Sequence, residues 1–195
     1  MSSKSLFLAV AVAAGLSGAV RADEPITPPA VPADIAAPAG FKPFLKGHAV
    51  GTQNYVCAPA ATASGFDWLF VGPQATIFDT EMEQILTHYQ SRNPLQNDAL
   101  HATWLHSRDS SAVWAKKFTG STDPGYVAPD AIEWLLLDVT GYQLGPTAGD
   151  RLTGAAFIQR VNTRGGLKPP ASGCTAATVN TRKLVQYEAD YYFYR

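Results

Sequence analysis

Residues 185–194 alternate between two kinds of side chain, and this period of two narrows the choice of fold more than any other feature. One set of alternate positions is apolar or aromatic: Val185, Tyr187, Ala189, Tyr191 and Phe193. The positions between them are Gln186, Glu188, Asp190, Tyr192 and Tyr194. Because the side chains of a strand point alternately to opposite faces of a sheet, this pattern predicts a C-terminal strand with one face in the core.

Shorter stretches of the same kind recur along the chain, separated by turn residues. We expect strands at 52–57, 67–71, 75–79, 85–89, 103–106, 112–118, 134–140 and 155–162. Turns at 80–83 and 107–111 predict two hairpins, and Gly72-Pro73 is expected to end the second strand. We find no long amphipathic helix in the sequence. The chain is therefore predicted to be all-β, a single-domain antiparallel sandwich or barrel.

The first 22 residues have the pattern of a secretory signal peptide. Lys4 supplies the positive charge, and an apolar run over 6–16 is followed by small residues that end at Ala22. The apolar run is much shorter than the roughly 20 residues that a helix needs to span a bilayer. We therefore expect a secreted or periplasmic protein with no membrane span after the signal is removed.

The chain contains two cysteines, Cys57 and Cys174. In an oxidising compartment, a lone pair of cysteines is most simply a disulfide. The alternatives are a reactive thiol or a metal ligand, but neither cysteine has the C-x-x-C spacing that would support them.

Residues 23–40 are rich in proline and alanine. This composition favours an extended arm or linker rather than a packed element, with the β-domain beginning near Phe41 and running to Arg195. If the arm serves only to reach a partner, its removal should abolish that association and leave the melting temperature unchanged.

Charge and motifs exclude several classes of function. The formal net charge is −1, which argues against a nucleic-acid-binding protein, since such a protein should show a basic face. The sequence contains no P-loop, no G-x-S-x-G and no G-x-G-x-x-G turn leading into a helix. We therefore expect no cofactor.

Several long motifs occur in an order that resembles one family. They are Ala49-Val50-Gly51-Thr52-Gln53-Asn54-Tyr55-Val56-Cys57, Trp134-Leu135-Leu136-Leu137, Ile158-Gln159-Arg160-Val161-Asn162-Thr163-Arg164-Gly165-Gly166, Cys174, and Tyr187-Glu188-Ala189-Asp190-Tyr191-Tyr192-Phe193-Tyr194. From about Val31 to the C-terminus the chain resembles the domain of unknown function 3455 family. The resemblance implies export and no particular activity. Some fungal members carry a malate dehydrogenase label, which we do not transfer because the strand–helix alternation of a dinucleotide fold is missing.

The first candidate site lies between residues 88 and 109. His88 and His106 can meet on adjacent strands, with Asp109 as a third group and Trp104 on the face of His106. The alternative is that these histidines bond to neighbouring backbone. No H-E-x-x-H or H-x-H spacing is present, so we assign no metal.

The second candidate site is the pair Arg160 and Asn162, which a regular strand would place on one face. Arg160 can hold a carboxylate or phosphate, and Asn162 can bind an amide or hydroxyl. The alternative is a structural ion pair of Arg160 with Asp138 or Glu133.

The third candidate is an aromatic platform for a sugar or other ring. It would be built from the four tryptophans and the C-terminal tyrosines, namely Trp68, Trp104, Trp114, Trp134, Tyr187, Tyr191, Tyr192 and Tyr194. The alternative is that these rings form the core.

Taken together, these residues favour a binding module for a small molecule, glycan or envelope component. The alternatives are a hydrolase-like or metal-assisted enzyme centred on His88, His106, Asp109 and Arg160, and a structural envelope protein. The binding module is preferred because no complete catalytic set is present.

The signal peptide generates a direct prediction about the mature N-terminus. Mass spectrometry of the exported protein should find a chain that begins at Asp23, after Val20-Arg21-Ala22, or at Val20, after Ser17-Gly18-Ala19. Detection of Met1 in the exported fraction would remove the signal peptide.

Overall fold

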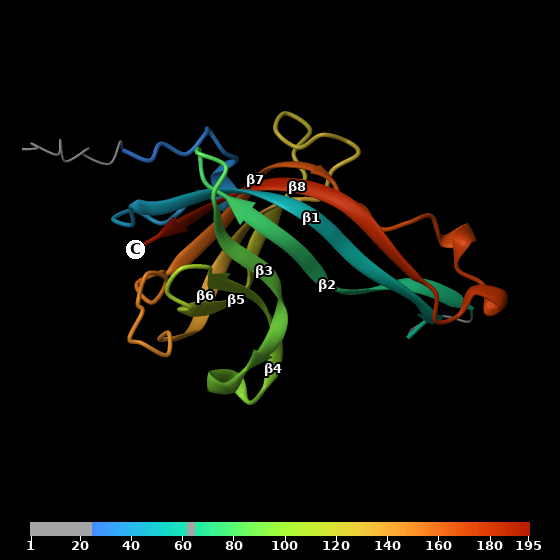
Figure 1. Ribbon diagram of the computed structural model, residues 1–195. Coiled ribbons are helices and arrows are strands. Elements are labelled where there is room, and N and C mark those ends of the chain that lie inside the picture. Colours follow the sequence, from blue (N-terminus) through green and yellow to red (C-terminus); the bar gives the residue numbers. More distant parts are fainter. Residues whose placement is uncertain (1–24, 62–64) are drawn as a thin grey trace, which may run out of the picture.

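Eight antiparallel strands close into a barrel in their sequence order (Figure 1). The computed structural model describes residues 25–61 and 65–195, so the expected signal peptide lies outside the described residues. The strands are β1 (Pro43–Pro59), β2 (Phe66–Phe78), β3 (Gln84–Asn93), β4 (Ala99–His106), β5 (Ala112–Ser121), β6 (Trp134–Gln143), β7 (Phe157–Gly165) and β8 (Arg182–Tyr194). In the described residues the only helices are single 3-10 turns, η1 (Ala33–Ile35), η2 (Pro94–Gln96), η3 (Ala171–Gly173) and η4 (Ala176–Thr178).

The all-β prediction is confirmed, and the fold is a barrel rather than a sandwich. The strand that decides this is β1, which pairs with β2 on one side and with the C-terminal β8 on the other. Ala49, for example, lies opposite Ile77 of β2 and Ala189 of β8. Closure provides every strand with two neighbours, which removes the free edges that an open sheet would expose.

The expected break at Gly72-Pro73 is wrong. Residues 66–78 form one continuous strand, and the dipeptide sits at a bulge where the register with β1 shifts between Asn54 and Tyr55. Gly72 takes a φ of 126°, which favours glycine, and a Cβ at this position would meet the side chain of Gln90. A bulge admits one extra residue and bends the strand without ending it. The turn signal therefore marks a bend inside β2.

The inside of the barrel holds the main apolar core. It is formed by alternate residues of the strands, among them Ile77, Leu86, Val113, Ile158 and Phe193, all of which are fully buried or nearly so. Leu152, from the connection between β6 and β7, adds to the same cluster and is 0% exposed. This loop residue helps to fill one end of the barrel.

A second cluster lies on the outside of β6, β7 and β8. Trp134, Leu136, Val161, Tyr192 and Tyr194 pack there against the segment before β1. From that segment Ile35 is 0% exposed, and its backbone oxygen accepts a 2.7 Å hydrogen bond from the Gln159 side chain. The expectation that residues 23–40 form no packed element is thus wrong around Ile35, because this isoleucine covers an apolar outer face of the sheet.

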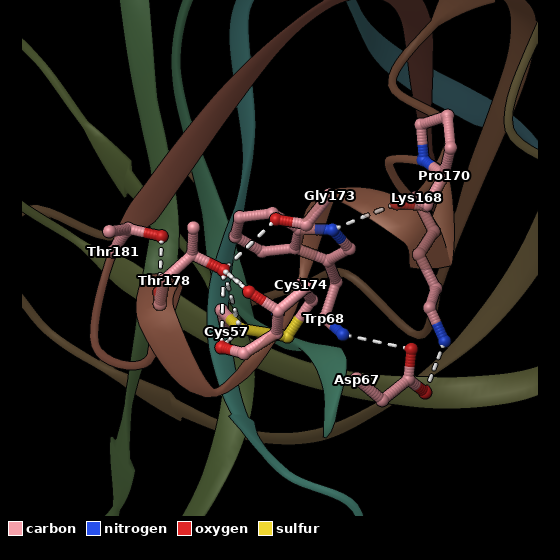
Figure 2. Close-up of a disulfide and its surroundings, with 10 residues drawn as sticks. Cys57, Asp67, Trp68, Lys168, Pro170, Gly173, Cys174, Thr178 and Thr181 are labelled. Carbon is pink, nitrogen blue, oxygen red and sulfur yellow. Dashed lines mark hydrogen bonds and ion pairs between the residues drawn. A yellow bond between two sulfur atoms is a disulfide. The ribbon is translucent and has the colours of Figure 1, made fainter. Parts of the chain in front are cut away.

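The disulfide joins the C-terminal end of β1 to the segment before β8 (Figure 2). Cys57 and Cys174 are joined as expected, and Trp68 of β2 packs beside them in a small third cluster. The Trp68 indole N–H donates to the backbone oxygen of Pro170 at 3.1 Å, and Lys168 pairs with Asp67 at 2.5 Å. These contacts hold the η3–η4 segment against the long ribbon of β1 and β2 that extends beyond the barrel (Figure 1).

A disulfide is compatible with an extracellular location. Among residues 25–61 and 65–195, no helix has the length and apolar character to cross a membrane.

The burial of Ile35 predicts that the N-terminal segment stabilises the barrel. Ile35→Ala should lower the free energy of unfolding by about 2–5 kcal/mol, because it removes buried methyl groups and leaves a cavity. The exposed neighbour provides a matched control, and Asp34→Ala should change stability by less than about 0.5 kcal/mol. Urea unfolding followed by circular dichroism measures both. Equal stability of the two variants would show that the segment does not support the fold.

Candidate functional site

A cavity of about 290 Å³ lies inside the barrel and opens to solvent at one end. Every one of the eight strands contributes to its wall. Taken in strand order, one lining residue from each is Gln53, Phe70, His88, Trp104, Ala115, Leu135, Arg160 and Tyr191. Phe70 and Leu100 are half or more exposed at the mouth, where Lys116 and Lys117 also lie. We call this cavity, with its mouth, the lumen pocket.

Two aromatic groups and a histidine form a stack deep in the lumen pocket. The rings of His88 and Trp104, on paired positions of β3 and β4, lie 4.2 Å apart and nearly parallel. Tyr191 of β8 meets both rings edge-on. Trp104 and His88 are 1% and 3% exposed, so this stack is a rigid wall of the cavity rather than a surface feature.

His88 is neutral in the folded protein. Burial lowers its pKa to about 3, with a hydrogen bond to the Thr103 carbonyl opposing that shift and the charge of Arg160 adding to it. Its Nδ1 lies 2.9 Å from the Thr103 carbonyl oxygen, which can only accept, so Nδ1 carries the proton and donates. Nε2 is then the unprotonated nitrogen of the ring.

Arg160 places a permanent positive charge inside the barrel. One terminal nitrogen, Nη2, donates to the backbone oxygen of Glu133 at 2.9 Å, whereas the buried Nε has no hydrogen-bond partner. The expected alternative of an ion pair with Asp138 or Glu133 is wrong. The Glu133 carboxylate pairs instead with Lys117 at 2.6 Å, and no carboxylate of the described residues lies within ion-pair distance of Arg160.

Two further buried donors of the lumen pocket lack partners. They are the indole Nε1 of Trp104 and the side-chain nitrogen of Gln53, which is 4% exposed. Among the described residues one other buried donor lacks a partner, Trp134 Nε1, which belongs to the outer cluster. The three residues that carry these donors all line the lumen pocket, and buried polar groups in native proteins are nearly always hydrogen-bonded to a protein group, a water or a ligand.

The tyrosines of the lumen stay protonated. Burial raises the pKa of Tyr191 and, to well above its usual range, that of Tyr187, and their hydroxyl oxygens lie 3.5 Å apart. Burial also raises the pKa of Tyr55, whose hydroxyl donates to the Gly166 carbonyl at 2.9 Å. None of these phenols supplies a negative charge near Arg160 at neutral pH.

His106 and Asp109 lie together but away from the lumen pocket. His106 Nδ1 is 3.0 Å from an Asp109 oxygen, at the turn between β4 and β5. Burial acts to raise the pKa of Asp109, but hydrogen bonds from the Arg151 and Ser111 backbones and the Ser111 hydroxyl lower it to about 2. Burial lowers the pKa of His106 despite the nearby carboxylate. The pair holds this turn against the β6–β7 connection, and neither residue lines the cavity with His88.

Asn162 also lies apart from Arg160. Its φ is 53°, and the register of β7 with β8 shifts between Val161 and Arg164. This irregularity turns Asn162 to the outside, where its side chain donates to Asp190 at 2.8 Å. The expectation that Arg160 and Asn162 share a face is therefore wrong, because it assumed a regular strand.

The four tryptophans do not form one platform. Trp104 lines the lumen pocket, Trp68 packs at the disulfide, and Trp134 lies in the outer cluster. Trp114 donates to Ser91 at 2.8 Å and is 5% exposed. Of the predicted residues, the structure thus brings together His88, Trp104, Arg160 and Tyr191.

Sequence reasoning missed Gln53 and the mouth residues. Gln53 shares its strand parity with Tyr55 and Cys57, and this signal places it on their face. Among the described residues, no group of three or more His, Cys, Asp and Glu side chains is arranged to hold a metal ion.

Comparison with known proteins assigns the chain to a family. A family model described as "Protein of unknown function (DUF3455)" matches residues 38–195. The chain belongs to this family, which confirms the resemblance seen in its motifs. The search of curated proteins and the search of solved structures each found no match.

The neutral state of His88 predicts an acid sensitivity of the fold. The unfolded chain takes up a proton near pH 6.5, but the buried ring does so only near pH 3. Stability from this residue is therefore complete above about pH 6.5 and is lost as the pH falls toward 3, by up to about 1.4 kcal/mol per pH unit. His88→Gln should flatten this part of the profile, measured by urea unfolding at a series of pH values.

The exposed His48 provides the control, since His48→Gln removes one histidine from the outer face of β1. If the free energy of unfolding falls equally steeply with decreasing pH in the wild type and in His88→Gln, the imidazole of His88 is not buried in its neutral form.

Proposed function

We propose that this member of the DUF3455 family is an exported binding protein whose barrel holds one small organic molecule in the lumen pocket. One observation carries the proposal: a solvent-connected cavity lined by all eight strands contains three buried donors without partners. Ligand pockets are typically concave and mostly apolar, with a few polar groups that orient the ligand. The lumen pocket has this character, with Phe70, Ala115 and Leu135 beside the donors of Trp104 and Arg160.

The separation of the histidines supports binding over catalysis. A metal-assisted or hydrolytic site needs its acid, base or ligands within reach of one reacting atom. His106 and Asp109 lie at the β4–β5 turn, whereas His88 stacks on Trp104 in the lumen. The enzyme alternative required His88, His106 and Asp109 to lie together, and their separation argues against it.

The same reasoning favours a small molecule over a glycan platform or a structural role. A sugar platform presents exposed aromatic faces, but all four tryptophans are at most 5% exposed. The alternative of a free proline-rich arm that reaches a partner is weakened by the packing of Ile35 into the outer cluster. Export remains part of the proposal, on the N-terminal signal pattern and the compatible disulfide.

Native mass spectrometry of the exported protein tests the proposal, with a variant that fills the cavity. The wild type should carry an added mass of a small organic molecule, which denaturing conditions remove. Ala102 of β4 lines the lumen pocket, so Ala102→Phe should abolish the added mass. Ala99 of the same strand is exposed and does not line the cavity, so Ala99→Phe should retain it.

Addition of the released molecule to stripped protein should raise the melting temperature. At a concentration 100-fold above Kd, binding stabilises by about 2.7 kcal/mol, or roughly 5–10 °C for a chain of this size. Lumen binding would be rejected if the exported protein has the mass of the polypeptide alone and if extracts of the exported fraction do not raise its melting temperature. An added mass that persists in Ala102→Phe would place the site elsewhere.

A further inference from the structure

The lumen pocket contains the positive charge of Arg160. None of the described residues that line the cavity is an aspartate or glutamate. Arg160 is partly buried, its guanidinium remains charged at all relevant pH values, and burial of a charge without a counterion is unfavourable. The protonated tyrosines and the neutral His88 cannot act as its counterion.

Arg160 is electrostatically central to this cavity. Its charge acts on Tyr55, His88, Tyr187 and Tyr191, which come from strands β1, β3 and β8. Its named hydrogen-bond partners are the Glu133 carbonyl oxygen, which accepts from Nη2, and the Tyr191 hydroxyl, and neither partner carries a negative charge. The guanidinium is thus held by neutral groups, with its Nε–H left unpaired.

The unpartnered atoms of the lumen pocket are all of one chemical kind. Arg160 Nε, Trp104 Nε1 and Gln53 Nε2 are all donors. A complementary ligand group must therefore offer acceptors, and an ionised carboxylate offers about four acceptor positions and no donor. An ammonium group or a neutral hydrogen-bond donor would leave these atoms unpaired, and the charge of an ammonium group would also be repelled by Arg160.

The charge available distinguishes a carboxylate from a phosphate. Among the residues that the structure describes, Arg160 is the single cation inside the cavity, and Lys117 at the mouth is already paired with Glu133. One guanidinium balances one negative charge and matches the planar geometry of a carboxylate. A dianionic phosphate would bring a second charge into a mostly apolar cavity with only Lys116 left at the mouth to offset it.

We propose that the ligand of the lumen pocket is a small organic monocarboxylate whose carboxylate binds Arg160 and the Trp104 N–H. This inference rests on the proposed function and names the chemical class of its ligand. The apolar body of the molecule lies against Ala115, Leu135 and Leu137 and extends toward the exposed rings and side chains of the mouth, Phe70 and Leu100. The cavity volume limits the ligand to the small end of the range that protein pockets accept.

Matched pairs of probes that differ only in charge test this assignment. Acetate, hexanoate and benzoate are compared with acetamide, hexanamide and benzamide by calorimetric titration and thermal shift, at constant chloride and ionic strength. At least one carboxylate should bind about 10- to 100-fold more tightly than its amide, the range expected for hydrogen bonds to a charged group. Phenyl phosphate is included beside benzoate.

Variants of Arg160 assign the effect to this residue. Arg160→Gln should remove the preference for the carboxylate, whereas Arg160→Lys, which keeps the charge but loses the planar fork, should retain part of it. Arg164→Gln provides the control, because Arg164 lies on the same strand and its side chain is 82% exposed. It should bind like the wild type.

Stability without ligand separates binding from a structural role. Because Arg160→Gln removes a partly buried charge that has no counterion, the ligand-free variant should melt at the same temperature as the wild type or higher. The proposal would be overturned by three results together: Arg160→Gln melts at a much lower temperature, Arg160→Lys melts like the wild type, and the wild type shows no preference for carboxylates. These results would make Arg160 a structural residue.

The remaining outcomes of the probe experiment can overturn the carboxylate assignment without overturning the proposal that the lumen pocket binds a small molecule. Equal binding of carboxylates and amides, or no binding by any probe pair, overturns the carboxylate assignment. In either case lumen binding still stands if the exported protein carries a molecule that Ala102→Phe excludes. Tighter binding of phenyl phosphate than of benzoate would also overturn it and identify a phosphate head group instead.

Discussion

The pairing of β1 with β8 is the interaction on which the rest of the structure depends. It joins the first strand to the last, so that Ala49 of β1 lies opposite Ala189 of β8 and the sheet has no open ends. This contact is also the one of greatest sequence separation in the barrel, and its formation must overcome the loop-closure entropy of the whole domain. Once it forms, every strand has an inside face that must be filled. The core of the barrel and the lumen pocket are both consequences of this closure.

The inside is filled unequally along the barrel axis. At one end, Leu152 and Phe193 complete an apolar core, and Asp109 holds the β6–β7 connection through the Arg151 backbone N–H. At the other end the lining changes to His88, Trp104 and Arg160, with a cavity between them. An apolar residue in place of Arg160 would avoid the desolvation of a charge. A charged group in such a place, with its Nε–H unpaired and no counterion beside it, is characteristic of sites where function rather than stability selects the residue.

Much of the fold could be predicted from local pattern. The alternation of 185–194 places Tyr191 and Phe193 inside, and the turns at 80–83 and 107–111 do connect paired strands. Prediction failed where a single residue departs from regular strand geometry. Gly72 and Asn162 both sit at register shifts with positive φ, and a bulge reverses the faces of all residues beyond it. A period of two therefore predicted the inward face of Tyr191 and Phe193 but neither the separation of His88 from His106 nor the outward turn of Asn162.

By itself, the sequence determined the strand type of the chain, the alternation of its faces, its family and the pair of cysteines available to each other. These follow from local periodicity and residue type, which act over a few positions. The tertiary structure decided that the sheet closes, that Ile35 covers an outer face, and that Arg160 meets Glu133 only through a backbone oxygen. It also decided which end of the barrel stays open. These outcomes depend on contacts between residues far apart in the chain, whose energies no local pattern encodes.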